Sequence, residues 1–186
     1  MKRSYLLAVI MLLILTACGG KKTYSYHPEY SSVFISRDGT LKSALVGEVD
    51  ENAKGSELES FAKEEVEEFN NLDANNNVKL ETSSIKDSKA KLIFSYNSFD
   101  SMQAFGKYTQ DSSFDLESVA VFKLSEVDFT SMDAIDIPEG TKGNYIAIIQ
   151  GSADIYTEGK ITYVSRNLDF KDNTVKVDGF TYIIFE

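Results

Sequence analysis

Residues 33–41, Val-Phe-Ile-Ser-Arg-Asp-Gly-Thr-Leu, join two apolar runs through an Asp-Gly pair. Asp-Gly between apolar runs is the strongest short-range signal of a β-hairpin, because a primed turn needs positive φ at both central residues. In the second run, Leu41, Leu45 and Val49 fall at odd positions and therefore share one face of a strand. The pattern predicts a hairpin over residues 33–49.

The segment after the hairpin carries the strongest helical pattern. Ser56 followed by Glu59 is typical of a capping box, and the Asn-rich run 70–77 is expected to end the helix because Asn tolerates left-handed φ. The acidic face could hold a cation or an acid–base pair, but nothing apolar surrounds it to raise a pKa, so we interpret it as solvated. The apolar stripe expected to face the core comprises Leu58, Phe61, Ala62, Val66, Phe69 and Leu72.

Two further strands, over residues 78–85 and 90–96, are predicted around a polar turn at 86–89. Ser98 is a candidate cap for a short helix, and Gly106 is the residue expected to stop it. The inward side chains of that short helix are expected to be Phe99, Met102 and Phe105.

Beyond residue 113 the chain reads as nearly all β. In the final strand both faces are apolar, which predicts a central, buried position in the sheet. The expected fold class is α+β, a mostly antiparallel β-sheet with one long amphipathic helix and one short helix. The predicted C-terminal strands are 116–124, 144–150, 153–157, 160–166, 168–171, 174–178 and 180–185.

The N-terminus has the pattern of a secretory signal peptide: Lys2 and Arg3, a short apolar run, and small residues at a cleavage site. Its last four residues, Leu15-Thr16-Ala17-Cys18, resemble the lipobox of bacterial lipoproteins. The resemblance implies cleavage between Ala17 and Cys18 and a diacylglyceryl group, carrying acyl chains such as palmitate, on the Cys18 thiol. Two acyl chains give stable anchoring, so the expected location is the outer face of the cell membrane.

Two other interpretations of this N-terminus were weighed against lipidation. The apolar run Tyr5–Leu15 has 11 residues, a helix of about 16 Å, which is too short to cross a hydrocarbon core of about 30 Å. Ordinary cleavage after Gly19 would release a soluble protein. We favour lipidation because Cys18 is the only Cys in the chain and occupies the position that the modification needs.

A second resemblance extends along the mature chain. The stretch from Ser32 to Leu41, the helix ending Glu67-Glu68-Phe69-Asn70, and the stretch Gly159–Ser165 are similar to those of small bacterial lipoproteins of uncharacterised function, from Gram-positive species. None of these stretches is a catalytic motif. The resemblance therefore supports the class and the location of the protein, and implies no activity.

These patterns divide the chain into three parts. Residues 1–17 are the signal peptide, residues 18–32 are the lipidated Cys and a flexible tether, and residues 33–186 form a single α+β domain with a candidate sub-domain seam at 107–113. The tether's Tyr24, Tyr26 and Tyr30 are expected either at a membrane interface or packed on the edge of the domain.

Charge excludes one class of partner. Removal of residues 1–17 takes away Lys2 and Arg3 and no acidic residue, so the net charge changes from −10 to −12. A surface this acidic does not bind nucleic acid, whose phosphates require Lys and Arg. It also repels anionic lipid, apart from Lys21 and Lys22 beside the anchor. The lipid bilayer is the expected partner through Cys18, with an envelope protein or a small ligand as a further partner.

Motifs for catalysis or metal binding are missing from the sequence. His27 is the only His and lies in the tether, so a Ser-His-Asp triad or a His-based zinc site has no partner residues. The calcium-like pattern from Asp50 to Gly55 has Lys54 in a ligand position and Phe61 where a closing Glu is needed. We expect no catalytic residue, no metal and no cofactor beyond the lipid.

Two function hypotheses follow from this sequence. The favoured one is a non-enzymatic envelope domain that binds a ligand or a partner outside the membrane. The alternative is a carboxylate-based hydrolase, which requires two acids facing each other across a groove, one of them with a raised pKa.

Overall fold

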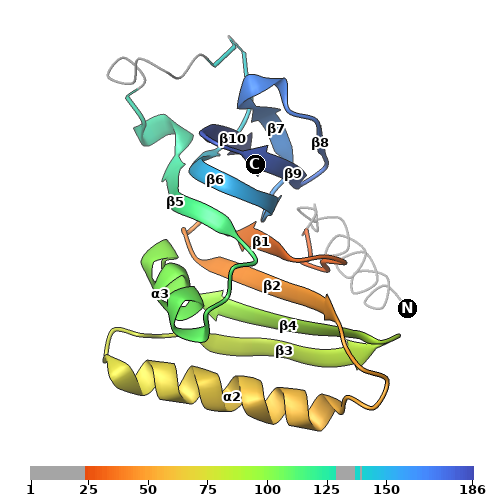
Figure 1. Cartoon of the computed structure of the whole chain (residues 1–186). Helices are drawn as coiled ribbons and strands as arrows, with labels where there is room; N and C mark the ends of the chain where they lie inside the picture. The colour runs from red at the N-terminus through yellow and green to blue at the C-terminus, as the bar shows by residue number, and fades with distance from the viewer. Residues whose placement is uncertain (1–23, 129–136, 139) are drawn as a thin grey trace, which may run out of the picture.

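The computed structural model describes residues 24–128, 137–138 and 140–186 (Figure 1). The predicted signal peptide, with Ala17, and the predicted lipid attachment residue Cys18 lie outside the described residues. Within those ranges the chain forms a ten-stranded, mostly antiparallel sheet with two α-helices, α2 (Gly55–Leu72) and α3 (Phe99–Thr109). The α+β prediction is confirmed.

The strands follow the order β3-β4-β2-β1-β6-β10-β7 in the sheet, while β5 and β9 also pair with β6 and β8 pairs with β9. The β1–β6 pair is parallel and the other pairs are antiparallel. The strands are β1 (Ser32–Ile35), β2 (Leu41–Glu48), β3 (Lys79–Lys86), β4 (Lys89–Tyr96), β5 (Asp115–Lys123), β6 (Tyr145–Thr157), β7 (Ile161–Val164), β8 (Phe170–Lys171), β9 (Thr174–Asp178) and β10 (Thr181–Phe185).

The long strand β6 connects the two halves of the sheet. Two separate strands were predicted here, over 144–150 and 153–157, and the structure merges them. One edge of β6 pairs with β5 and then β1, and the other edge pairs with β10 and then β9. The strand continues because Gly151, which was expected to interrupt it, adopts a φ of +122° that the ladder accommodates.

The predicted 33–49 hairpin is confirmed as β1 and β2, but its turn is of a different type. Gly39 takes a φ of +83° while Asp38 does not enter the left-handed region, and the Gly39 N–H donates to the Ser36 carbonyl at 3.2 Å. Asp38 keeps a negative φ because its Oδ1 accepts from the Thr40 N–H at 2.9 Å and from the Thr40 hydroxyl at 2.7 Å. Two successive positive φ angles occur instead in the β3–β4 turn, at Asp87 and Ser88.

The start of α2 contradicts the capping-box prediction. The helix begins at Gly55 with Lys54 as its N-cap, and no side chain caps it. Ser56 is therefore already inside the helix, two residues past the N-cap position, where its hydroxyl does not act as the cap. Glu59 instead accepts from Lys63 one turn ahead, at 2.6 Å.

Two members of the predicted apolar stripe of α2 do not face the core. Phe61 is 60% exposed and Leu72 is 68% exposed. The buried side of the helix is narrower than predicted because α2 lies along the edge strand β3 and contacts the sheet mainly through that strand (Figure 1). Ala62 and Phe69 are the fully buried residues of the helix.

The Asn-rich run does end α2, but the predicted reason, a left-handed backbone, is wrong. The helix ends through side-chain hydrogen bonds instead. The residue after the helix, Asp73, is extended, with a φ of −149°. The Asn76 amide donates to the Phe69 carbonyl at 2.7 Å, and the Asn70 amide bonds both the N–H and the carbonyl of Val78. The Asn76 bond satisfies a carbonyl that the end of a helix leaves unpaired, and the Asn70 bonds join the helix to the chain just before β3.

Helix α3 begins as predicted and ends later than predicted. The Ser98 hydroxyl accepts from the Ser101 N–H at 3.1 Å, which makes it the cap, and Met102 and Phe105 are buried. Gly106 does not stop the helix. The helix continues to Thr109. It ends there because Gln110 takes the left-handed conformation and the Asp111 N–H donates to the Gly106 carbonyl at 2.8 Å.

This difference between the two helix starts predicts different responses to the same substitution. Ser98→Ala is expected to lower the free energy of unfolding by about 1 kcal/mol, because it removes the N-cap of α3. Ser56→Ala is the matched control and is expected to change stability by less than about 0.5 kcal/mol. Denaturant unfolding of the two variants measures this. Equal losses would show that the two serines have the same role.

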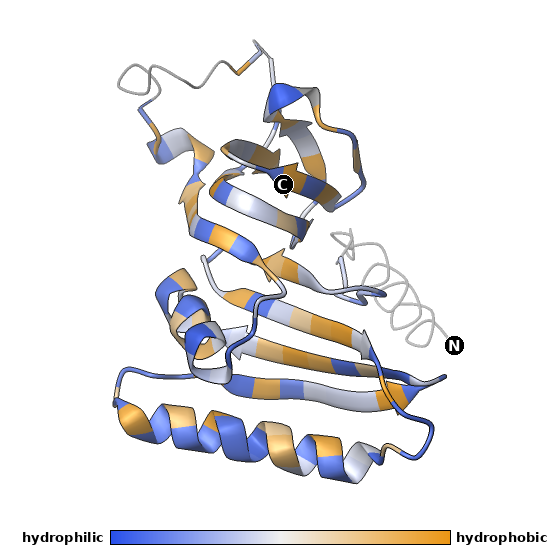
Figure 2. Cartoon of the chain, viewed as in Figure 1, coloured by the Kyte–Doolittle hydropathy of each residue, from blue (hydrophilic) through white to orange (hydrophobic). Residues whose placement is uncertain are grey.

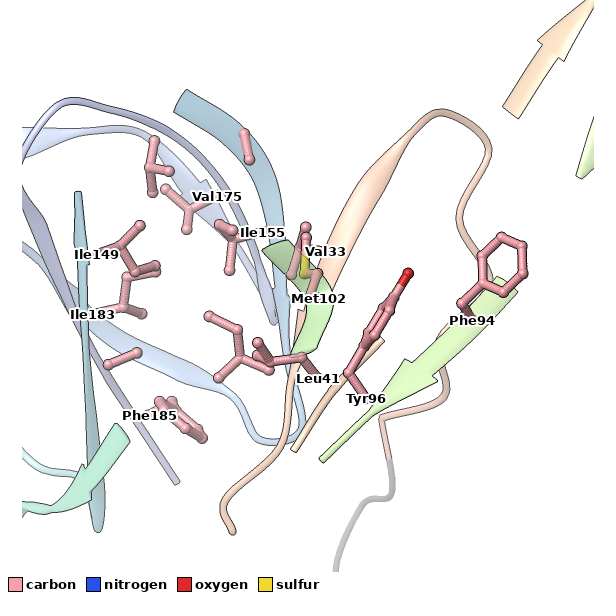
Figure 3. Close-up of a cluster of buried hydrophobic side chains, with 14 of the residues drawn as sticks. Val33, Leu41, Phe94, Tyr96, Met102, Ile149, Ile155, Val175, Ile183 and Phe185 are labelled. Atoms are coloured by element: carbon pink, nitrogen blue, oxygen red, sulfur yellow. The ribbon is translucent and has the colours of Figure 1, made fainter. Parts of the chain in front are cut away.

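The larger of two buried apolar clusters extends across both halves of the sheet (Figure 3). Val33 and Leu41 of the hairpin lie between the helix side, represented by Phe94 and Tyr96, and side chains of β6, β9 and β10. All five residues of β10 are buried, which confirms the central position predicted for the last strand.

Residues 24–31 form no helix or strand, yet their tyrosines pack on the sheet. The Tyr26 ring lies 5.2 Å from Phe34 and 5.3 Å from Tyr156, measured between ring centroids, and its hydroxyl donates to the Ser32 carbonyl at 2.7 Å. Tyr30 lies 6.5 Å from Tyr156. Of the two positions left open by the sequence, Tyr26 and Tyr30 therefore occupy the one on the domain.

Candidate functional site

A pocket of about 670 Å³ lies between α2, α3 and the face of β2 and β4 that the helices cover. Strand register places its lining on one face, because Ser43 pairs with Phe94 and Leu45 pairs with Leu92. Its volume is in the range of sites that hold drug-sized ligands. The apolar lining includes Leu45, Leu92, Phe94, Phe99, Met102, Phe105, Phe114 and Leu116.

Aromatic contacts hold the walls of this pocket in place. Phe105 of α3 lies 5.2 Å from Phe69 of α2 and 5.1 Å from Phe94 of β4, measured between ring centroids. The Tyr108 hydroxyl donates to Glu68 Oε2 at 2.8 Å, which joins α3 to α2 a second time. Because both helices and the sheet are tied together, the pocket is formed without a ligand.

Two buried hydroxyl groups line the inner part of the pocket. Ser43 Oγ and the Tyr96 hydroxyl share a hydrogen bond of 2.8 Å, and both residues are at most 5% exposed. Burial raises the pKa of Tyr96 above its ordinary value. The phenol is therefore neutral at physiological pH and forms a satisfied part of the wall.

Polar groups gather at the rim rather than inside. Phe61 and Glu65 lie one turn apart on the flank of α2 that borders the pocket, and Glu65 is half-buried. Across from them, Lys107 Nζ donates to Gln103 Oε1 at 3.1 Å on α3. An apolar interior with a polar rim suits a ligand that has an apolar body and one polar end.

The carboxylates that line this pocket are Glu65 and Asp111. Asp111 Oδ1 accepts from the Ser113 N–H at 2.9 Å and from the Ser113 hydroxyl at 2.6 Å, so it holds the loop after α3 in a turn. A hydrolase built on two facing carboxylates would have to use this pair. The bonds to Ser113 favour a structural role for Asp111.

The other sequence candidates do not assemble into a site. His27 is exposed. In the calcium-like segment, Asp50 Oδ1 accepts from both nitrogens of Asn52, and these bonds lower the pKa of Asp50. Within residues 24–128, 137–138 and 140–186, no group of three or more His, Cys, Asp or Glu side chains is placed to hold a metal ion.

Sequence reasoning missed the pocket itself. Phe61 was assigned to the core and Gly106 to a helix end, and Glu65 was given no site role, whereas all three line the pocket. The signal available in the sequence was the breadth of the α2 apolar stripe. A stripe that includes both Phe61 and Ala62 is wider than one edge strand can cover.

Comparison of the chain with protein-family models, with curated proteins and with solved structures finds no match. In the described part of the chain, no helix is both long and apolar enough to span a bilayer. The lipobox-like sequence and the pocket geometry are therefore the observations on which a functional proposal rests.

Proposed function

We propose that this chain is a lipoprotein anchored through Cys18 to the outer face of the cell membrane, and that its domain binds an apolar or amphipathic small molecule without transforming it. The observation that carries the binding role is the 670 Å³ pocket with an apolar interior and a polar rim. The observation that supports the location is the Leu15-Thr16-Ala17-Cys18 sequence.

The aromatic residue at the rim supports ligand binding. Phe61 is 60% exposed beside the pocket, although it lies next to the fully buried Ala62 on the same helix. A molecule seated in the pocket would cover part of this ring and remove its apolar area from water. The ligand would then complete the contact between α2 and α3 at this end.

A carboxylate-based hydrolase is the second candidate, favoured only because the pocket brings Glu65 and Asp111 to one lining. Binding is preferred because Asp111 already bonds Ser113 through two hydrogen bonds. In the hydrolase, Glu65→Gln would leave ligand affinity nearly unchanged and abolish turnover, whereas in a binding protein no turnover exists to lose.

Pocket binding is tested by filling the pocket from α3. The chain from Gly19 onward lacks Cys18 and so carries no lipid, which means that it needs no detergent. This chain is titrated with the apolar dye N-phenyl-1-naphthylamine. We expect a fluorescence increase with micromolar affinity. Gln103→Trp places a large ring in the pocket and is expected to weaken binding at least about tenfold, equivalent to about 1.4 kcal/mol.

Ala104→Trp is the matched control, because Ala104 is exposed, adjacent on α3 and absent from the pocket lining. It is expected to leave dye affinity unchanged. If the wild-type chain does not bind the dye, or if both Trp variants weaken binding equally, the pocket is not the binding site.

A further inference from the structure

The face of the sheet opposite the helices carries a charge unlike that of the whole protein. Register fixes which side chains share this face, because directly paired residues of neighbouring strands point to the same side. Phe34 pairs with both Lys42 and Tyr156, and the rows continue from Lys42 to Ser95 and Lys79 and from Val46 to Lys91 and Ser84. We call this surface the lysine face, and its lysines are Lys42, Lys79, Lys86, Lys89, Lys91, Lys171 and Lys176.

Five carboxylates share the lysine face in the described strands, including Asp115 and Asp178, which both pair with Ser152. Glu48 pairs with Lys89, Asp154 pairs with Lys176, and Glu81 lies 3.7 Å from Lys42. Seven lysines against five acids leave a balance of two positive charges on a protein whose net charge is −10, and five of these lysines lie on β2, β3 and β4, where Glu48 and Glu81 are the acids of this face. Lys86 and Lys89 are paired directly across the β3–β4 hairpin, with Glu48 paired to Lys89 from β2, so two positive charges and one negative charge meet at this end of the sheet.

The opposite side of the molecule is strongly acidic. Helix α2 carries six Glu and one Lys, and it packs on the other face of the sheet. In Figure 2, hydrophilic residues recur along the whole length of α2, in alternation with hydrophobic ones. The fold therefore separates charge across the sheet, with the negative side on the helices and the positive side on the lysine face.

The chain leaves the domain toward its N-terminus on this same positive face. Tyr26 packs against Phe34 and Tyr156, both of which point to the lysine face. From Cys18 to Tyr24 is six residues, a reach of at most about 20 Å. A lipid on Cys18 would therefore hold this face close to the bilayer, with Lys21 and Lys22 in between.

Exposed aromatic rings border the lysine face near this exit. Tyr30 is 48% exposed and Phe170 is 42% exposed, and both line one shallow depression together with Lys171 and Lys176. Aromatic and lysine side chains of this kind are favoured at the boundary between lipid headgroups and water.

We propose that the lysine face lies flat on an anionic lipid bilayer and that the pocket and acidic α2 point away from it. This inference rests on the proposed Cys18 anchor, which supplies proximity, while the lysines supply orientation. Anionic headgroups attract lysines near the membrane surface and repel the Glu side chains of α2. The pocket mouth is then open to the extracytoplasmic space.

The absence of Trp from the chain allows a direct test with single Trp reporters. Ser84→Trp places a reporter on the lysine face, on the edge strand β3 and so three strands from β1. Phe61→Trp places the matched reporter on α2, and both positions are exposed. The full lipidated chain is reconstituted in vesicles of roughly 30% phosphatidylglycerol and 70% phosphatidylcholine, an anionic content close to that of a biological membrane. Part of the phosphatidylcholine carries a nitroxide on its headgroup.

We expect the nitroxide lipid to quench Ser84→Trp about twofold or more and to leave Phe61→Trp nearly unquenched. Quenching of Ser84→Trp is expected to fall with added salt, which screens exposed charges. Quenching is also expected to fall in the double variant Lys86→Gln and Lys91→Gln. It is expected to remain unchanged in the double variant Lys54→Gln and Lys63→Gln, which removes two lysines on the α2 side.

The contrary outcomes separate the two proposals. Vesicle flotation without quenching at Ser84→Trp, or with stronger quenching at Phe61→Trp, overturns the orientation while leaving the anchor intact. Equal quenching in vesicles of phosphatidylcholine alone overturns the role of anionic lipid. Failure of the full chain to float with vesicles overturns the anchor itself.

Discussion

Cys18→Ala is expected to abolish incorporation of radiolabelled palmitate and to release the protein from the membrane fraction of the cell. The thiol of Cys18 is the only one in the chain, so no other side chain can receive the diacylglyceryl group. Two acyl chains give stable membrane binding, whereas the described domain offers no apolar helix that spans a bilayer. Metabolic labelling followed by membrane fractionation measures both effects.

Gly20→Ala is the matched control for that experiment, because it changes a residue beside the lipobox-like tetrapeptide and keeps the Cys. It is expected to be labelled and retained as the wild type is. Palmitate label on the Cys18→Ala chain, or recovery of the wild-type chain from culture fluid with an unmodified N-terminus, would contradict the lipoprotein proposal.

Gly151→Ala is expected to lower the free energy of unfolding by about 3 kcal/mol or more, equivalent to a fall in Tm of roughly 6–12 °C. A Cβ at this position would lie 2.1 Å from the Asp115 carbonyl oxygen, and the backbone φ of +122° is one that L side chains rarely adopt. The change would separate β6 from β5 at the place where β6 passes from one set of partners to the next.

Gly47→Ala provides the comparison for this effect. Gly47 lies on β2, its φ is ordinary, and no atom lies within 4 Å of an added Cβ. The same substitution there is expected to be neutral or to stabilise by about 0.5–1 kcal/mol, because Ala loses less backbone entropy than Gly on folding. Thermal and denaturant unfolding compare the two variants. A similar response at both positions would show that β6 bends freely at Gly151.

The elements predicted correctly from sequence are those with a local cause. The Asp-Gly pair between two apolar runs predicted the 33–49 hairpin, and the polar turn at 86–89 predicted the β3–β4 pair. The Ser98 hydroxyl predicted the start of α3, and two apolar faces predicted the buried position of β10. Each of these depends on residues within one turn or one strand of each other, which a sequence displays directly.

The errors share a different cause. Ser56 and Gly106 had the residue types of a helix start and a helix end, but neighbouring backbone offered other partners, and Gly151 was absorbed into a strand by the strands on both its edges. Phe61 was assigned to the core because periodicity shows which side of a helix is apolar and not how wide a surface covers it.

The same distinction applies to the candidate sites. The lipobox-like tetrapeptide is contiguous, so the sequence alone determined the proposal for Cys18, as it determined the α+β class through the periods of its strands and helices. The pocket and the lysine face join residues that are far apart in the chain, such as Glu65 with Asp111 and Lys42 with Lys176. Only tertiary structure decided these, because strand order and register determine which distant side chains share a face.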